Sequence, residues 1–271
     1  MEENMGRLFA VIIFTATIHA IDTLSYSVRI AGIKTKRLAM ALSLFNIIVL
    51  ISRTANMIQA PLLGSMVDKA IAQGQVSLLL KGFRMIIFSA TVGSIVGAAM
   101  IPSFVEIFSR GIIAFERAGS VPVLISNAVY RGSFKKIKES FKKPRISLLK
   151  RYCFDKIPPT FLILNLIITS VSTIGVLSAI YAGALLPDYR ITASQLSGII
   201  NGTATILLAV LVDPQAAMIT DQTLQGIRER QEANAMVVLL ITGKIFGTLL
   251  SQLIFLPASK IVVLLTTFLV K

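Results

Sequence analysis

The chain has 271 residues, of which 55% are hydrophobic and only 15% are charged. Its mean hydropathy is +0.79, whereas a soluble domain typically carries about 25% charged residues. Apolar stretches long enough to cross about 30 Å of hydrocarbon recur along the chain, and the alternating segments of about ten residues that a β-barrel needs are absent. We therefore expect an all-α, polytopic helical membrane protein and exclude a soluble core and a β-barrel.

Six spans are predicted, each to within a few residues, and short or basic loops separate them. In chain order the spans cover 8–28, 38–59, 85–107, 160–186, 196–219 and 236–257. Segment 103–130 is semi-apolar but contains acidic and basic residues, so it could extend the third span, lie in the interface or re-enter the membrane. We expect an extension followed by an interfacial segment.

The basic residues indicate how the chain is oriented. Lysine and arginine number 27 against 13 acidic residues, and the net charge is +14. Loops 29–37, 108–159 and 220–235 hold 18 of the basic residues, while the other loops and the tails hold 7. The positive-inside rule then places these three loops in the cytoplasm and both termini outside a cytoplasmic membrane. Orientation explains the charge better than nucleic acid does, so no nucleic-acid partner is expected.

Segment 131–156 interleaves lysine and arginine with phenylalanine, isoleucine and leucine. A basic amphipathic segment of this kind is typical of a surface that binds anionic membrane lipids. We therefore expect anionic lipids as partners of the central loop.

The two ends of the chain resemble each other weakly. Pro61 and Asp68 have the same spacing as Pro214 and Asp221, and further short matches recur in order at an offset of about 150 residues. Three spans in each half would make the halves enter the membrane from opposite sides, as in many transporters whose site lies between inverted repeats. We predict a first half-repeat at 1–130, a basic cytoplasmic loop at 131–159 and a second half-repeat at 160–271. The alternative is chance similarity between apolar sequences.

The first span carries a polar stripe. At 100° per residue, five of its side chains fall within about 80° of one another: Thr15, His19, Asp22, Tyr26 and Arg29. Ionisable side chains within a membrane cost roughly 2.5–3.5 kcal/mol each and usually line a cavity or pathway. We therefore expect this face to point away from lipid.

Other spans add polar groups to the same predicted cavity. Asn46, Arg53 and Asn56 share one face of the second span, and Lys244 lies within the sixth. Snorkelling to the interface is the alternative for both cations. A cationic chamber with apolar walls suits an anionic amphiphile, because guanidinium pairs with phosphate through two hydrogen bonds.

The sequence lacks the common motifs of nucleotide-binding, metal-binding and hydrolytic sites. No Walker P-loop appears, and one histidine and one cysteine cannot build a usual zinc site. A Gly-x-Ser-x-Gly elbow is missing, as is the set of several histidines typical of lipid phosphatases. We therefore expect a protein that is not an enzyme, without catalytic residues, metal or cofactor.

Two segments carry a resemblance to a known family: Ala16-TIHAIDTLSYSVRIAGIKTKR-Leu38 and Leu50-ISRTANMIQAPLLGSMV-Asp68. They resemble the Amj family, the lipid II flippases that are alternatives to the MurJ type, and the similarity covers the whole chain. The resemblance implies transport of the undecaprenyl-pyrophosphate-linked peptidoglycan precursor across the bacterial cytoplasmic membrane, for cell-wall biogenesis. It supplies no established catalytic motif and no oligomeric state.

The residue roles are our own hypothesis. Arg53 would contact the pyrophosphate, and Arg29 would guide it from the inner face. Asp22 would hold Arg29 or Arg53 in the absence of substrate, and His19 would tune this exchange with pH. The sequence leaves two alternative functions open: an ion-coupled exporter of another anionic solute, and an intramembrane polyprenyl-phosphate enzyme.

Overall fold

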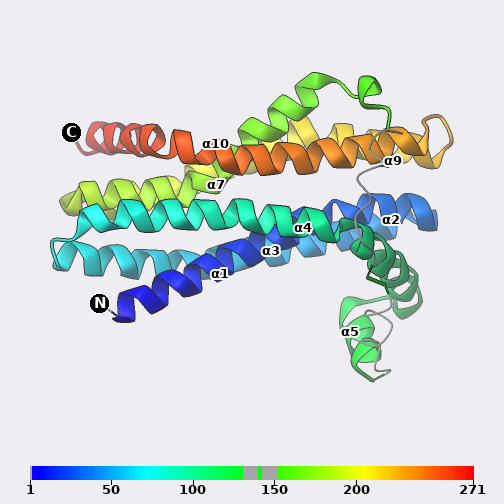
Figure 1. The fold of residues 1–271 in the computed structure, drawn as a ribbon, viewed down its shortest axis with the longest axis horizontal. Helices are drawn as coiled ribbons and strands as arrows, with labels where there is room; N and C mark the ends of the chain where they lie inside the picture. The colour runs from blue at the N-terminus through cyan, green and yellow to red at the C-terminus, as the bar shows by residue number, and fades with distance from the viewer. Residues whose placement is uncertain (1, 131–139, 142–151) are drawn as a thin grey trace.

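The computed structural model describes residues 2–130, 140–141 and 152–271, and over these residues it is helical (Figure 1). In chain order its elements are α1 (Glu2–Ser25), α2 (Ser27–Thr35), α3 (Leu38–Ala72), α4 (Val76–Ala118), α5 (Val121–Tyr130), η2 (Phe154–Lys156), α7 (Pro159–Leu185), η3 (Pro187–Tyr189), α8 (Arg190–Leu207), the π-helical segment η4 (Leu208–Val212), α9 (Asp213–Leu224) and α10 (Arg230–Val270). The basic segment 131–156 falls largely outside the described residues.

Six helical stretches are long and apolar enough to cross a membrane, which confirms the expected number of spans. They run over Gly6–Thr35, Leu38–Ala72, Val76–Ala118, Pro159–Leu185, Pro187–Leu224 and Arg230–Val270. Five of these stretches are longer than the predicted spans, while Pro159–Leu185 nearly coincides with the predicted span 160–186. The predicted loop 60–84, for example, is largely helix, with only Gln73–Gln75 between α3 and α4. The protein is therefore a multi-pass membrane protein.

Segment 103–130 divides into two parts. Helix α4 continues through Pro102 to Ala118 and ends at Gly119, whose φ of 71° is readily adopted by glycine. Helix α5 then leaves the bundle at an angle (Figure 1). The extension of the third span is confirmed, while the interfacial position of α5 stays a prediction.

Both termini lie at the same end of the bundle, as an even number of spans requires (Figure 1). The α3–α4 connection lies at this end too, and the α2–α3 and α9–α10 connections lie at the opposite end. We call these the terminal end and the loop end. Loops 29–37 and 220–235, both expected in the cytoplasm, thus lie at the loop end. The start of loop 108–159, the third loop expected there, lies at the same end.

Two helices break within their spans. Between α1 and α2, the hydroxyls of Thr23, Ser25 and Ser27 donate to carbonyls of their own helix, at His19, Asp22 and Leu24. Such back-bonding competes with the helical ladder and bends helices. In the fifth span, η4 precedes Pro214, whose missing N–H interrupts the ladder.

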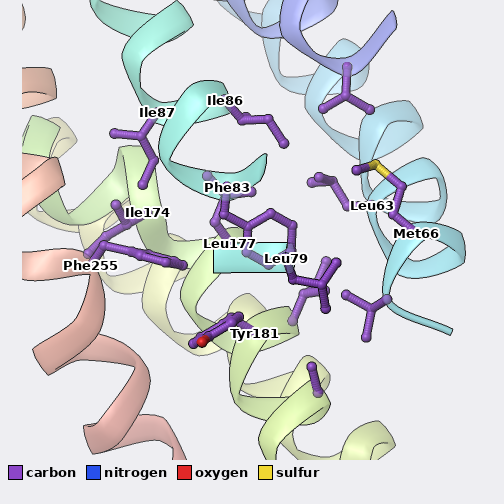
Figure 2. Close-up of a cluster of buried hydrophobic side chains, with 14 of the residues drawn as sticks. Leu63, Met66, Leu79, Phe83, Ile86, Ile87, Ile174, Leu177, Tyr181 and Phe255 are labelled. Atoms are coloured by element: carbon purple, nitrogen blue, oxygen red, sulfur yellow. The ribbon is translucent and has the colours of Figure 1, made fainter. Parts of the chain in front are cut away.

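The apolar cores differ along the bundle. At the terminal end one cluster joins residues 1–130, the N-terminal half, to residues 160–271, the C-terminal half. Phe83 contacts Tyr181 and Phe255 edge to face at its centre, and Leu63 and Met66 of α3 pack beside them (Figure 2). Separate clusters lie elsewhere, one around Val28 and Ile112 in the N-terminal half and one around Phe161 and Met236 that belongs mainly to the C-terminal half.

Candidate functional site: a polar cavity between the halves

A cavity of about 450 Å³ lies among the spans and receives side chains from all six of them. Most of its wall comes from α1, α3, α7 and α8, which are the first two spans of each half. Helix α4 contributes only Ile86, and α10 contributes Leu240 and Lys244. The first two helices of each half therefore enclose the cavity, and the third helix of each supports them from behind.

Glycines set how closely the supporting helices approach. A Cβ on Gly93 or Gly97 of α4 would collide with the backbone of Ala16 or Ala20 in α1. A Cβ on Gly243 or Gly247 of α10 would collide with Asn165, or with Leu166 and Thr169, in α7. Small residues at four-residue spacing let membrane helices approach closely. The two glycine pairs are related by an offset of 150 residues, the same offset that the sequence matches show.

Six of the eight predicted site residues line the cavity: His19, Asp22, Tyr26, Arg53, Asn56 and Lys244. The other two do not. Asn46 is exposed on α3, and the neighbouring Phe45 takes the place in the wall. Arg29 lies behind the wall, where only 3% of its side chain is exposed.

Arg29 is held in place by two partners of different kinds. Its Nη2 donates to Asp213 Oδ1 at 2.8 Å, and its guanidinium lies 4.7 Å from the centre of the Phe45 ring. Its Nε and Nη1 are buried and find no hydrogen-bond partner in the described part of the chain. The contacts with Asp213 of α9 and Phe45 of α3 therefore join three helices at one wall of the cavity.

Asp22 pairs with Lys244, not with Arg29 or Arg53 as we expected. Lys244 Nζ lies 3.1 Å from Asp22 Oδ2, and Ser52 adds a side-chain hydrogen bond to the same carboxylate. Spacing along one helix could not predict this partner, because Lys244 follows Asp22 by 222 residues. The pair joins α1 to α10 and thus joins the two halves across the cavity.

Arg53 is the exposed cation of the cavity. It interacts electrostatically with Asp213, but within the described residues it forms no ion pair. Its guanidinium therefore keeps its donors for a ligand. With Asn56 and Met57 it lies where α3 is both part of the cavity wall and exposed at the surface.

The sequence interpretation missed part of the polar wall. Gln59 donates to Thr15 Oγ1 at 2.5 Å, which joins α3 to α1. Ser52 and Gln59 share a stripe of α3 with Asn56, and this periodicity was available in the sequence. Asp213 was not among the predicted site residues, although a carboxylate directly after an apolar run is itself a signal.

On α7 and α8, hydroxyl and amide groups complete the wall: Thr169, Ser172, Thr173, Ser197, Asn201 and Thr205. Among the residues that the structure describes, the buried Oδ1 atom of Asn201 has no hydrogen-bond partner, and neither has Nδ1 of His19 on the other side. Among the described residues, no group of three or more His, Cys, Asp or Glu side chains could hold a metal ion. The cavity thus offers cations and hydrogen-bonding groups within an apolar bundle.

The comparisons with known proteins agree with this picture. Residues 14–266 match the family model described as "Amj: Alternate to MurJ". The chain is 40% identical over 254 residues to the Bacillus subtilis (strain 168) protein named "Lipid II flippase Amj", and the match covers 93% of this chain and 94% of that protein. No solved structure gives a significant match. The chain belongs to the Amj family.

Proposed function

We propose that this protein is a lipid II flippase, which moves the undecaprenyl-pyrophosphate-linked precursor across the bacterial cytoplasmic membrane without altering it covalently. The observation that carries the proposal is Arg53, whose guanidinium forms no ion pair with the described residues and lies at the exposed edge of a polar cavity inside an apolar bundle. The 40% identical relative named lipid II flippase supports the choice of substrate.

The chemistry of the cavity matches the pyrophosphate of such a lipid. A pyrophosphate brings two negative charges, and guanidinium binds phosphate oxygens with two parallel hydrogen bonds. The amides and hydroxyls of Asn56, Ser197 and Asn201 can donate to sugar or phosphate oxygens beside it. A volume of about 450 Å³ lies within the roughly 300–1,000 Å³ typical of small-molecule sites.

The apolar surface where the cavity opens between α3 and α8 suits the polyprenyl tail. Helix α3 packs on α1, α2, α4 and α7, and helix α8 packs on α7 and α10, so the two line the cavity without packing closely on each other. Apolar side chains are exposed on both helices: Ile51, Met57 and Ile58 on α3, and Ile199 and Ile206 on α8. We propose that the headgroup enters between these helices while the tail stays in lipid, which avoids burying the polar head in hydrocarbon.

The orientation of the chain in the membrane and the inverted repeat of its two halves belong to the same proposal. The excess of basic residues favours a cytoplasmic loop end and external termini. The two glycine pairs and the matching wall positions of α1, α3, α7 and α8 support two inverted three-helix repeats. In that arrangement the cavity would lie near the membrane centre, where inverted-repeat transporters hold their substrates. Anionic lipids would contact the basic central loop.

The test replaces Arg53 in a strain depleted of its own flippases. Arg53→Ala should abolish growth rescue at unchanged protein level, since the cavity loses a cation that no described carboxylate pairs with. Arg53→Lys should rescue partially, because an ammonium keeps the charge but not the paired hydrogen bonds. Thr54→Ala is the matched control, since Thr54 is exposed on the same helix outside the cavity. Full rescue by Arg53→Ala would remove Arg53 from the mechanism.

An accessibility assay separates the proposal from its alternatives. Labelled lipid II in proteoliposomes should become accessible on the far side with its mass unchanged. A changed mass would indicate a polyprenyl-phosphate enzyme. Lipid II that stays on its own side would indicate an exporter of another solute.

A further inference from the structure

The cavity has a charge balance that a pyrophosphate would upset. Arg53 and Lys244 line it, and Arg29 lies directly behind its wall; the carboxylates are Asp22 and Asp213. With His19 neutral, three cations face two anions, and the net charge is one positive. A bound pyrophosphate diester would bring two negative charges and leave one in excess. An uncompensated charge in a low-dielectric site is costly, and such sites commonly change protonation instead.

We propose that the Asp22–Lys244 pair is a proton-binding site linked to the substrate: a phosphate oxygen takes Asp22's place on Lys244, and Asp22 takes up one proton. This inference rests on the proposed function and adds a proton to it. Lys244 stays protonated, the proton comes from solvent and forms one O–H bond on Asp22, and no other covalent bond changes. The occupied cavity is then electrically neutral.

Geometry selects Asp22 over Asp213 as the proton acceptor. Asp213 keeps its partner Arg29, which is 3% exposed behind the wall and is not presented to the cavity. Asp22 depends on Lys244, which does line the cavity and can therefore turn to a ligand. The Asp22 side chain is 29% exposed, so water in the cavity can deliver the proton.

The other ionisable groups around Asp22 are the alternative sites at which the proton could bind. His19 and Tyr26 line the cavity from the same span, Arg53 from α3, Lys244 from α10 and Asp213 from α9. Helices α4, α7 and α8 present no ionisable side chain to the cavity within the described residues. His19 lies one turn from Asp22, and its Nδ1 has no hydrogen-bond partner among the described residues, so it is the strongest competitor for the proton.

The experiment measures proton uptake directly. Purified protein in detergent is titrated with lipid II in two buffers of equal pH and different ionisation enthalpy. We expect the protein to take up about one proton for each lipid II molecule that it binds. Where this uptake is complete, the affinity for lipid II should fall by up to about tenfold for each unit by which the pH is raised. Binding without uptake in the wild-type protein would overturn this inference and leave the flippase proposal intact. Absence of binding would overturn both.

Variants identify the acceptor. Asp22→Asn should bind lipid II with no proton uptake and no pH dependence, whereas Asp22→Glu should keep the uptake because it keeps a carboxylate. His19→Gln should also keep it. Thermal unfolding of each variant checks that the bundle is intact, and Asp22→Glu still tests the site if the asparagine variant does not fold. Uptake that survives in Asp22→Asn and disappears in His19→Gln would overturn the assignment to Asp22.

Discussion

Contacts within each half differ in kind from those between the halves around the cavity. Within a half, α1 meets α4 and α7 meets α10 along glycines that bring one helix against the backbone or side chains of the other. Around the cavity, the halves meet through two ion pairs, Asp22–Lys244 and Arg29–Asp213. Close apolar packing has one good arrangement, while an ion pair can exchange partners. The difference suggests that each half moves as a unit and that motion between them is controlled by charge.

The two ends of the interface between the halves differ as well. The terminal end has a shared apolar core around Phe83, Tyr181 and Phe255. Toward the loop end, Arg29 and Asp213 join α2 to α9, and each of these helices follows a break in its span. Irregular segments such as η4 often mark functional positions in helices. We therefore expect the ion-paired region to separate more readily than the aromatic core.

The largest effect on stability should come from placing a large side chain at a glycine of α4 that contacts α1. Gly93→Leu places side-chain atoms where the backbone of Ala16 lies, so α1 and α4 must separate. We expect destabilisation at or above the upper end of the ~1–3 kcal/mol typical of overpacking, seen as lost yield and a lowered Tm. Gly111→Leu on the same helix is the control, because no atom of the described residues lies within 4 Å of a Cβ there. Equal stability of the two variants would contradict a rigid half.

A similar or smaller effect should follow from breaking the Arg29–Asp213 pair. Arg29→Met leaves Asp213 without its ion-pair partner, and we expect a loss of about 3 kcal/mol. This is the lower end for a broken buried pair, because the Asp213 side chain is 38% exposed. Adding Asp213→Leu should recover most of the stability, since an apolar pair of similar volume carries no desolvation cost. Denaturant unfolding of both single variants and the double variant gives the coupling free energy, and a value near zero would contradict a controlling ion pair.

The sequence predicted the number of spans and much of the wall because both depend on local patterns. Apolar length gives the spans, and helical periodicity puts His19, Asp22 and Tyr26 on one face. The partners depend on how distant helices pack, which no spacing encodes. Lys244 and Asp22 were both predicted as site residues, but their pairing with each other was not. Arg29 was placed on the correct stripe, and only the packing of α2 against α9 shows that it lies behind the wall.

The smallest effect concerns an ion pair between the halves that lies outside the cavity. Arg190 Nη1 lies 3.1 Å from Asp68 Oδ1, and the two side chains are 49% and 59% exposed. Exposed pairs contribute only about 0–1 kcal/mol and weaken with salt. Arg190→Gln should therefore change unfolding by less than about 1 kcal/mol, and salt should erase the difference. A loss as large as that of Arg29→Met, insensitive to salt, would show that the halves are held together well beyond the cavity, and charge inside it would no longer explain how they separate.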